Sequence, residues 1–296
     1  MKKIYKRKKT TLASLDQSLP RLPDDEVWIY NTGKLSMNDY HASNKSISNS
    51  LIKAMNDPSV SDYAAYRNHI KKDIVREEKK HFDIGAAAHM AILEPDIYAD
   101  QVVVQPIEIK RRHGKVWDQF SEANADKLIL TKNDHMQIDD YVNVIKSNKH
   151  AKRLLSGCSS EVSGFRKDPK TGLIVRARAD AINHGGKYIC DLKFMENVSP
   201  ASFSKAVVNY KYYLQSYVYK YVFDVQDFIF VCISKTDPSE VAIYVLDGDF
   251  ELHAKNEFDD AMIKIKNNQQ NHRWDSYTTE QDPIRVLAPP QWFINQ

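Results

Sequence analysis

The segment RARADAINHGGKYICDLKF, residues 176–194, constrains this chain more than any other. It reads as two β-strands joined at a Gly-Gly pair, which is suited to the two-residue turn of an antiparallel hairpin. With that turn, Asp180 is predicted to lie directly opposite Asp191, and Arg178 opposite Lys193. Like charges placed directly opposite one another destabilise an antiparallel pair. Two opposed carboxylates on a half-buried sheet therefore need a counter-charge.

A divalent cation would supply that charge. Mg²⁺ prefers oxygen ligands and is usually held by one or two carboxylates, waters and a substrate phosphate. Asp191 and Lys193 are two residues apart and so share a face of the strand. Lys193 could orient or deprotonate an attacking water, or neutralise charge in a phosphoryl transition state. The alternative is a surface hairpin whose Asp and Lys side chains pair in solvent.

The pattern along the chain predicts a mixed α/β (α+β) fold. Helices are expected over 46–58, 83–95, 131–155, 199–222 (with a break near Asn209) and 249–268. Strands are expected over 101–106, 161–168, 172–183, 187–194, 228–235 and 241–248. Helices, a mostly antiparallel meander, a helix, two strands and a last helix fit a mixed central sheet flanked by helices.

Two stretches are strongly basic. MKKIYKRKKT at 1–10 has six basic residues in ten. Residues 1–36 lack sustained periodicity, so we expect a loose basic N-terminal arm, either a solvated tail or a non-specific phosphate-binding arm. Residues 37–296 are expected to form one domain. The second stretch, IKRRHGK at 109–115, forms an internal basic cluster of Lys110, Arg111, Arg112 and Lys115.

Two helical segments offer further polar candidates. His89 lies among alanines in GAAAHMAILEP (85–95), and Gln215 and Tyr219 are four apart in a tyrosine-rich segment and so share a helical face. Each could equally be an ordinary core residue.

Taken in order, these pieces resemble the PD-(D/E)xK nuclease superfamily, and specifically the RecE-type exonucleases (exodeoxyribonuclease VIII) and the RecB-like group. The ordered pieces are ISNSL (47–51), GAAAHMAILEP (85–95), EVSGFRKDPKTGLIVRARAD (161–180), DLK (191–193) and YYLQSYVY (212–219). The resemblance covers the chain from about Met37, and implies a restriction-endonuclease-like core. The proline that precedes the first motif aspartate in the family is Ala179 here.

The resemblance also implies roles for individual residues. Asp180 and Asp191 would be metal carboxylates, with the Leu192 carbonyl as a further ligand. His89 would complete the ligand set or hold a second metal, and Glu161 would be a further acidic member at the edge of the site. The remaining roles fall to three side chains: Lys193 would act on the water, and Gln215 and Tyr219 would orient the site or contact the scissile strand.

For DNA binding, we expect Lys110, Arg111, Arg112 and Lys115 to grip phosphate near the 5′ end. Alternation along the strand places Arg176 and Arg178 on the face of Asp180, where they could line the strand path. Solvated surface cations are the alternative for both groups.

The activity implied is an Mg²⁺-dependent exonuclease, with Mn²⁺ as a substitute, that degrades the 5′ strand of linear double-stranded DNA. The 3′ single strand left behind would serve an annealing protein of the RecT type in recombination. The family also implies a toroidal homo-oligomer and a bacterial or phage-encoded origin.

Two other functions stay open. One is a RecB-like DNA nuclease of other polarity or an endonuclease, although three scattered cysteines do not suit its iron–sulfur branch. The other is a non-catalytic DNA-end-binding protein. Few cysteines and no long apolar run fit a cytoplasmic protein without a membrane span.

Overall fold

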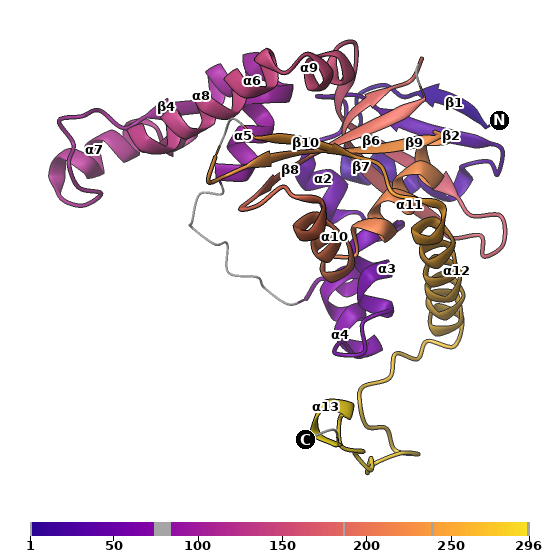
Figure 1. Ribbon diagram of the computed structural model, residues 1–296. Coiled ribbons are helices and arrows are strands. Elements are labelled where there is room, and N and C mark those ends of the chain that lie inside the picture. Colours follow the sequence, from indigo (N-terminus) through magenta and orange to yellow (C-terminus); the bar gives the residue numbers. More distant parts are fainter. Residues whose placement is uncertain (1, 74–83, 186, 238–239, 295–296) are drawn as a thin grey trace.

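A central mixed sheet organises the computed structural model, which describes residues 2–73, 84–185, 187–237 and 240–294 (Figure 1). Its strand order is β1-β2-β6-β7-β8-β9-β10, with β3 beside β7. The bounds are β1 Lys3–Lys6, β2 Glu26–Tyr30, β3 Ile47–Ser48, β6 Ser159–Lys167, β7 Ile174–Asn183, β8 Tyr188–Met195, β9 Asp227–Ser234 and β10 Val241–Tyr244. The expected mixed sheet flanked by helices is confirmed. It is less antiparallel than the sequence indicated, because β8 and β9 run parallel.

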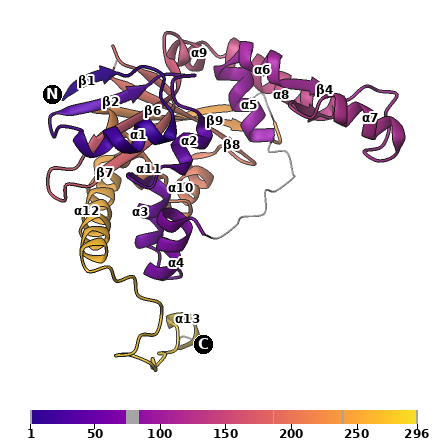
Figure 2. The same cartoon turned by 180° about the vertical axis from the view of Figure 1, so that it is seen from behind.

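Helices cover both faces of the sheet (Figures 1 and 2). On one face lie α3 Asn49–Met55, α4 Asp62–Tyr66, α10 Pro200–Asn209, α11 Tyr212–Phe223 and α12 Gly248–Gln270. On the other lie α5 Ile84–Leu93, α6 Pro95–Gln101, α8 Lys132–Ser147 and α9 Lys149–Leu155. Short pieces complete the chain: α1 Leu12–Ser18, a 3₁₀ turn Leu19–Arg21, α2 Met37–Ala42, a π-helical turn Arg67–Lys71 and α13 Gln291–Ile294. No helix in the described ranges is long and apolar enough to cross a membrane.

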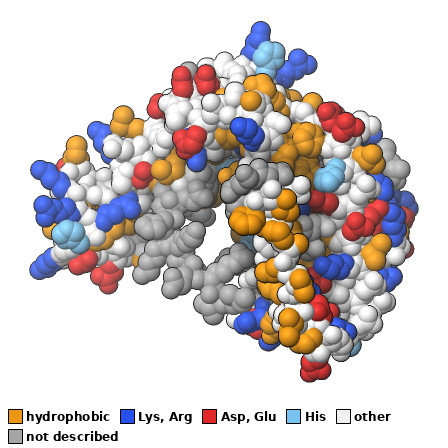
Figure 3. Space-filling model, turned by 60° about the horizontal axis from the view of Figure 1, so that its bottom comes forward, with side chains coloured by type: hydrophobic (Ala, Val, Ile, Leu, Met, Phe, Trp, Pro, Cys, Tyr) orange, Lys and Arg blue, Asp and Glu red, His pale blue; other side chains and the backbone are white. Residues whose placement is uncertain are grey.

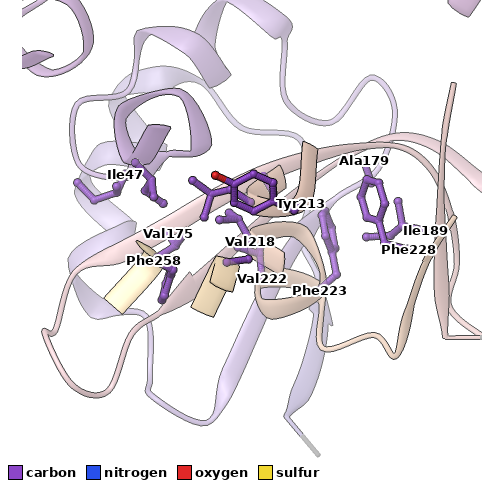
Figure 4. Close-up of a cluster of buried hydrophobic side chains, with 14 of the residues drawn as sticks. Ile47, Val175, Ala179, Ile189, Tyr213, Val218, Val222, Phe223, Phe228 and Phe258 are labelled. Atoms are coloured by element: carbon purple, nitrogen blue, oxygen red, sulfur yellow. The ribbon is translucent and has the colours of Figure 1, made fainter. Parts of the chain in front are cut away.

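The largest core cluster lies between the sheet and α3, α11 and α12 (Figure 4). Strand residues Val175, Ala179 and Ile189 meet Val218 and Phe223 of α11 there. Gly164 of β6 allows this close approach, since a Cβ built on it would lie 2.6 Å from Cε1 of Phe223. This packing places the polar side chains of α11 directly over β8.

Local capping and a break in the chain determine where the helices that carry the site begin and end. Ser48 accepts a hydrogen bond from the backbone N–H of Leu51 and so caps α3. The predicted break near Asn209 is confirmed, because Tyr210 ends α10 and Lys211 takes a left-handed conformation (φ 50°) before α11 begins. The break turns the chain, so that α11 starts beside the end of α3.

The first 36 residues do not form the loose arm that their composition suggested. β2 pairs antiparallel with β6, and β1 pairs parallel with β2. Leu15, Leu19 and Trp28 are buried against Phe165 in a separate core cluster. Lysines alternate with apolar residues only briefly here, so the periodicity was too short to reveal an edge of the sheet.

Residues 102–130 form a projection from the helical layer of α5 and α8 (Figure 1). It contains a two-stranded parallel sheet, β4 Val102–Val104 with β5 Leu128–Leu130, and α7 Lys115–Ala123 at its tip. In both ribbon views α7 lies at the far end of the projection, away from the central sheet.

Candidate active site

The two motif aspartates stand where β7 and β8 separate. The hairpin register is as predicted for the paired residues, and the ladder ends at Ala181 opposite Cys190. From Asp191 onward β8 pairs with β9 alone, while β7 pairs with β6 and β3. Asp180 and Asp191 are therefore the first residues beyond the ladder on their strands, at the fork between them.

The separation of the strands corrects one expectation. Arg178 is not paired with Lys193, because the β7–β8 ladder ends at Ala181 and Cys190; its partner is Ser163 of β6. Its guanidinium forms an ion pair with Glu161 (Nε to Oε2, 2.8 Å). Glu161 itself has a left-handed backbone (φ 48°) at a gap in the β6–β7 ladder. Such a conformation costs a glutamate roughly 1–3 kcal/mol and is often found at functional sites.

Asp180 accepts two contacts on one oxygen. The Leu192 N–H donates to Oδ2 at 3.0 Å, and Nδ1 of His89 lies 3.3 Å from the same oxygen. No described residue forms a hydrogen bond or ion pair with Oδ1 of Asp180. Burial, followed by the charge of Asp191, raises the Asp180 pKa from 3.8 to about 7. Without a cation, then, the ionised form of this carboxylate is disfavoured in the folded protein.

Asp191 is held from the helix above it. Nε2 of Gln215, on α11, donates to Asp191 Oδ1 at 2.7 Å. The Lys193 ammonium forms an ion pair with Asp191 Oδ2 and lies 3.5 Å from Oε1 of Gln215. Asp191 is only 1% exposed, so its position is fixed by these contacts. Gln215 thus contacts both Asp191 and Lys193.

Lys193 keeps its positive charge in this arrangement. Burial alone would lower its pKa, but the charges of Asp191 and Asp180 outweigh burial and raise the pKa above its usual value. The ammonium lies 4.7 Å from the ring centroid of Tyr212, which adds a cation–π contact. Lys193 therefore remains charged at neutral pH and suits stabilisation of an anion better than abstraction of a proton.

A cavity of about 930 Å³ opens beside the fork. His89, Glu161, Asp180 and Tyr219 line it, with Arg176 and Arg178. Burial and the neighbouring negative charges raise the pKa of Tyr219 well above its ordinary value, so its hydroxyl stays neutral. The fork, α5 and α11 thus bring together the predicted set.

Arg176 is less available than the sequence suggested. It is buried and donates to the Ser43 carbonyl (2.6 Å) and to Ser46 Oγ (3.2 Å), and its guanidinium lies 5.1 Å from the centroid of the Tyr40 ring. These contacts tie β7 to the segment that follows α2. Arg176 supports the wall of the cavity and has little freedom to follow a DNA strand.

The fork is suited to a divalent cation. No three His, Cys, Asp or Glu side chains in the described part of the chain form a metal site by themselves. Two carboxylates meet at the fork, however, and Oδ1 of Asp180 is not engaged by other described residues. Mg²⁺ commonly uses one or two carboxylates and completes its octahedron with water and phosphate oxygens. The donor set therefore fits such an ion.

The predicted phosphate-binding cluster lies elsewhere. Lys110, Arg111 and Lys115 are exposed near the tip of the projection, and Figure 3 shows Lys and Arg side chains gathered at that end of the molecule. Arg112 instead holds the loop together: Nε donates to Gln105 Oε1 (3.0 Å) and Nη2 to the Ile129 carbonyl (3.1 Å). The structure does not bring this cluster to the carboxylates.

One residue near the site had no sequence signal. Lys53 of α3 reaches the Tyr210 carbonyl at the α10–α11 junction and lies 5.8 Å from the Tyr212 ring centroid, on the ring that also contacts Lys193. Only the packing of α3 against α11 brings residues 140 positions apart in sequence together. An isolated lysine in an amphipathic helix predicts nothing of this kind.

Comparison with known proteins identifies a family whose model spans the strands and helices that carry the site. The family model described as "PDDEXK-like domain of unknown function (DUF3799)" matches residues 48–286. No curated protein matches the sequence. A crystal structure of a "Putative exonuclease" from Eubacterium rectale has a similar fold, with a TM-score of 0.57 and 14% identity over 88% of this chain and 97% of that one. The crystal structure of SSO0001 also aligns at 14% identity, covering 72% of this chain and 84% of that chain, but its TM-score is 0.29.

Proposed function

This chain belongs to the PDDEXK-like family, and from that premise we propose that it is an Mg²⁺-dependent nuclease that degrades the 5′-terminated strand of linear double-stranded DNA. The observation that carries the proposal is the fork, where Asp180 lines a cavity, Asp191 lies buried on the neighbouring strand and Lys193 contacts Asp191. PDDEXK nucleases generally use divalent metal ions. Mg²⁺, with Mn²⁺ as a substitute, is the ion that the oxygen-rich donor set favours.

The side chains have separate roles in this proposal. Asp180, Asp191 and His89 would hold the cation, with the Leu192 carbonyl as a further ligand. When bound, the ion would supply Lewis-acid polarisation of the phosphodiester and acidify a water. Lys193 would stabilise the negative charge that grows on the phosphate. Gln215 fixes Asp191 and Lys193 relative to each other, so that neither has to reorganise during the reaction.

Glu161 is proposed as a supporting residue at the edge of the site. Its ion pair with Arg178 holds both side chains beside the cavity. Its charge also raises the pKa of Asp180, after the larger effects of burial and Asp191. Tyr219 would donate its neutral hydroxyl toward the strand in the cavity.

Duplex DNA would be gripped partly by the projection. Lys110, Arg111 and Lys115 are the residues proposed to contact phosphates there. Replacing any one should weaken duplex binding and reduce the slope of log K against log salt by about 0.9. Arg112→Ala should mainly loosen the loop, because its donors are already used within the projection.

Strand polarity, a toroidal homo-oligomer, and handover of the 3′ strand to a RecT-type annealing protein belong to the proposal through the resemblance to RecE-type enzymes. The direct test is digestion of linear duplex labelled at the 5′ or the 3′ end, with Mg²⁺ or EDTA. The wild type is compared with Asp191→Asn and with Asp140→Asn, which changes an exposed aspartate of α8.

We expect release of the 5′ label, abolished by EDTA and by Asp191→Asn but not by Asp140→Asn. Earlier loss of the 3′ label, or cuts in circular DNA, would overturn the polarity or the exonuclease assignment while keeping a nuclease. Binding without any metal-dependent cleavage would overturn the enzymatic proposal in favour of a DNA-end-binding protein.

A further inference from the structure

Lys53 of α3 lies at the α10–α11 junction, on the aromatic ring that Lys193 also contacts. Its Nζ donates to the Tyr210 carbonyl at 2.7 Å. The ring of Tyr212 contacts both lysines, with centroid distances of 5.8 Å to Lys53 Nζ and 4.7 Å to Lys193 Nζ. Two ammonium groups thus share one aromatic ring, although their charges repel.

Lys53 has no direct carboxylate partner in the described part of the chain. Among the described residues, none forms an ion pair with it, although its side chain is half-buried. Lys211, by contrast, is paired with a carboxylate, since its Nζ lies 3.1 Å from Glu257 Oε2. Buried charges are normally paired with opposite charges, so a half-buried lysine whose ammonium donates to a carbonyl but forms no ion pair with a described residue indicates a place for an anion.

The electrostatic surroundings agree with this geometry. Burial, followed by the charge of Lys193, lowers the Lys53 pKa to about 8, although Asp191 opposes the shift and Lys211 adds to it. An anion bound near the two ammonium groups would offset their mutual repulsion. Lys53 remains mostly charged at neutral pH and so can bind such an anion directly.

An exposed aromatic ring lies next to these lysines. Tyr210, at the junction of α10 and α11, is 63% exposed, and its ring centroid is 5.6 Å from that of Tyr212. Exposed aromatic rings beside basic side chains are the usual elements of single-strand binding, in which bases stack and phosphates pair with cations.

We propose that Lys53 and Tyr210 form a nucleotide subsite of the active site, in which Lys53 binds a backbone phosphate of the substrate strand and Tyr210 stacks on an adjacent base. This inference rests on the proposed nuclease function. The strand would run from the cavity at Asp180, past Lys193, to α3 and the α10–α11 junction. Because stacking and a phosphate contact carry no base identity, the subsite would accept any sequence.

The test is binding of a fluorescent single-stranded oligothymidylate to the full chain in EDTA, measured by anisotropy over a salt series. The variants are Lys53→Met, Lys53→Arg and Tyr210→Ala. The matched control is Lys205→Met, which removes an exposed lysine of α10. Thermal unfolding of each variant verifies the fold, and Tyr210→Ala alters a side chain too exposed to support the core.

Lys53→Met should reduce the slope of log K against log salt by about 0.7, the value for one phosphate contact on a single strand. Lys53→Arg should keep the slope, and Tyr210→Ala should weaken binding about tenfold. Wild-type slope and affinity in Lys53→Met and Tyr210→Ala, or an equal loss in Lys205→Met, would overturn the subsite.

Cleavage of duplex DNA by the wild type with Mg²⁺ is measured in parallel. If the wild type cleaves and Lys53→Met binds normally, the subsite fails and the nuclease function stands. If the wild type does not cleave but binding depends on Lys53 and Tyr210, the nuclease function fails and the strand-binding site stands.

Discussion

Asp180→Asn should stabilise the metal-free protein at the same time as it inactivates it. The Asp180 pKa is about 7 in the folded protein, against an ordinary value of 3.8. The folded state therefore keeps a proton that the unfolded state releases, and stability falls as pH rises from about 4 to 7. At 1.36 kcal/mol per pKa unit, the ionised carboxylate costs roughly 4 kcal/mol above pH 7.

Part of this cost is relieved because the Asp180 side chain is 19% exposed, so we expect a gain of about 2 kcal/mol for the variant at pH 8. Asparagine can still accept the hydrogen bond from the Leu192 N–H, which limits secondary losses.

The assay is urea unfolding of the wild type and Asp180→Asn in EDTA at pH 4 and pH 8. The variant should be more stable at pH 8, with the difference shrinking toward zero at pH 4. Mg²⁺ should then raise the stability of the wild type at pH 8 more than that of the variant, because a ligand bound only by the folded state adds RT ln(1 + [L]/Kd). A variant that is less stable at pH 8, or a difference that does not change with pH, would refute the reasoning.

Three further predictions test the fold and the site. Gly164→Ala should lower the free energy of unfolding by about 1–3 kcal/mol, because its Cβ would meet the buried Phe223 ring. Gly248→Ala is the control, since nothing lies within 4 Å of its Cβ, and it should leave the free energy of unfolding unchanged in chemical denaturation. Gln215→Leu should lower the cleavage rate about 10–100-fold by releasing Asp191, and should lower stability by about 1–3 kcal/mol because the buried Oδ1 loses its donor. An unchanged rate would remove its orienting role. Deletion of residues 2–30 should abolish cooperative thermal unfolding, because β1, β2 and the buried leucines of their cluster are lost; a normal melting transition would mean that these residues are dispensable after all.

The hairpin illustrates how far local sequence can go. A two-residue turn fixes the register of the strands on either side, so the pairing of Ala181 with Cys190 was predictable. The fork immediately beyond was not, because β8 leaves β7 to pair with β9, a strand more than 30 residues later in the chain. The same limit explains why Arg178 was expected to face Lys193 and instead pairs with Glu161.

The sequence by itself determined the order of the helices and strands from about residue 131 onward, the broken helix around Asn209 and the identity of the two aspartates at the hairpin, because periodicity, turn residues and residue chemistry are local properties. Only the tertiary structure decided that the N-terminal segment belongs to the sheet, that Gln215 holds Asp191 and Lys193, and that Lys53 shares the Tyr212 ring with Lys193. These features depend on contacts between segments distant in the chain. Their strength comes from burial and packing, which no short window of sequence contains.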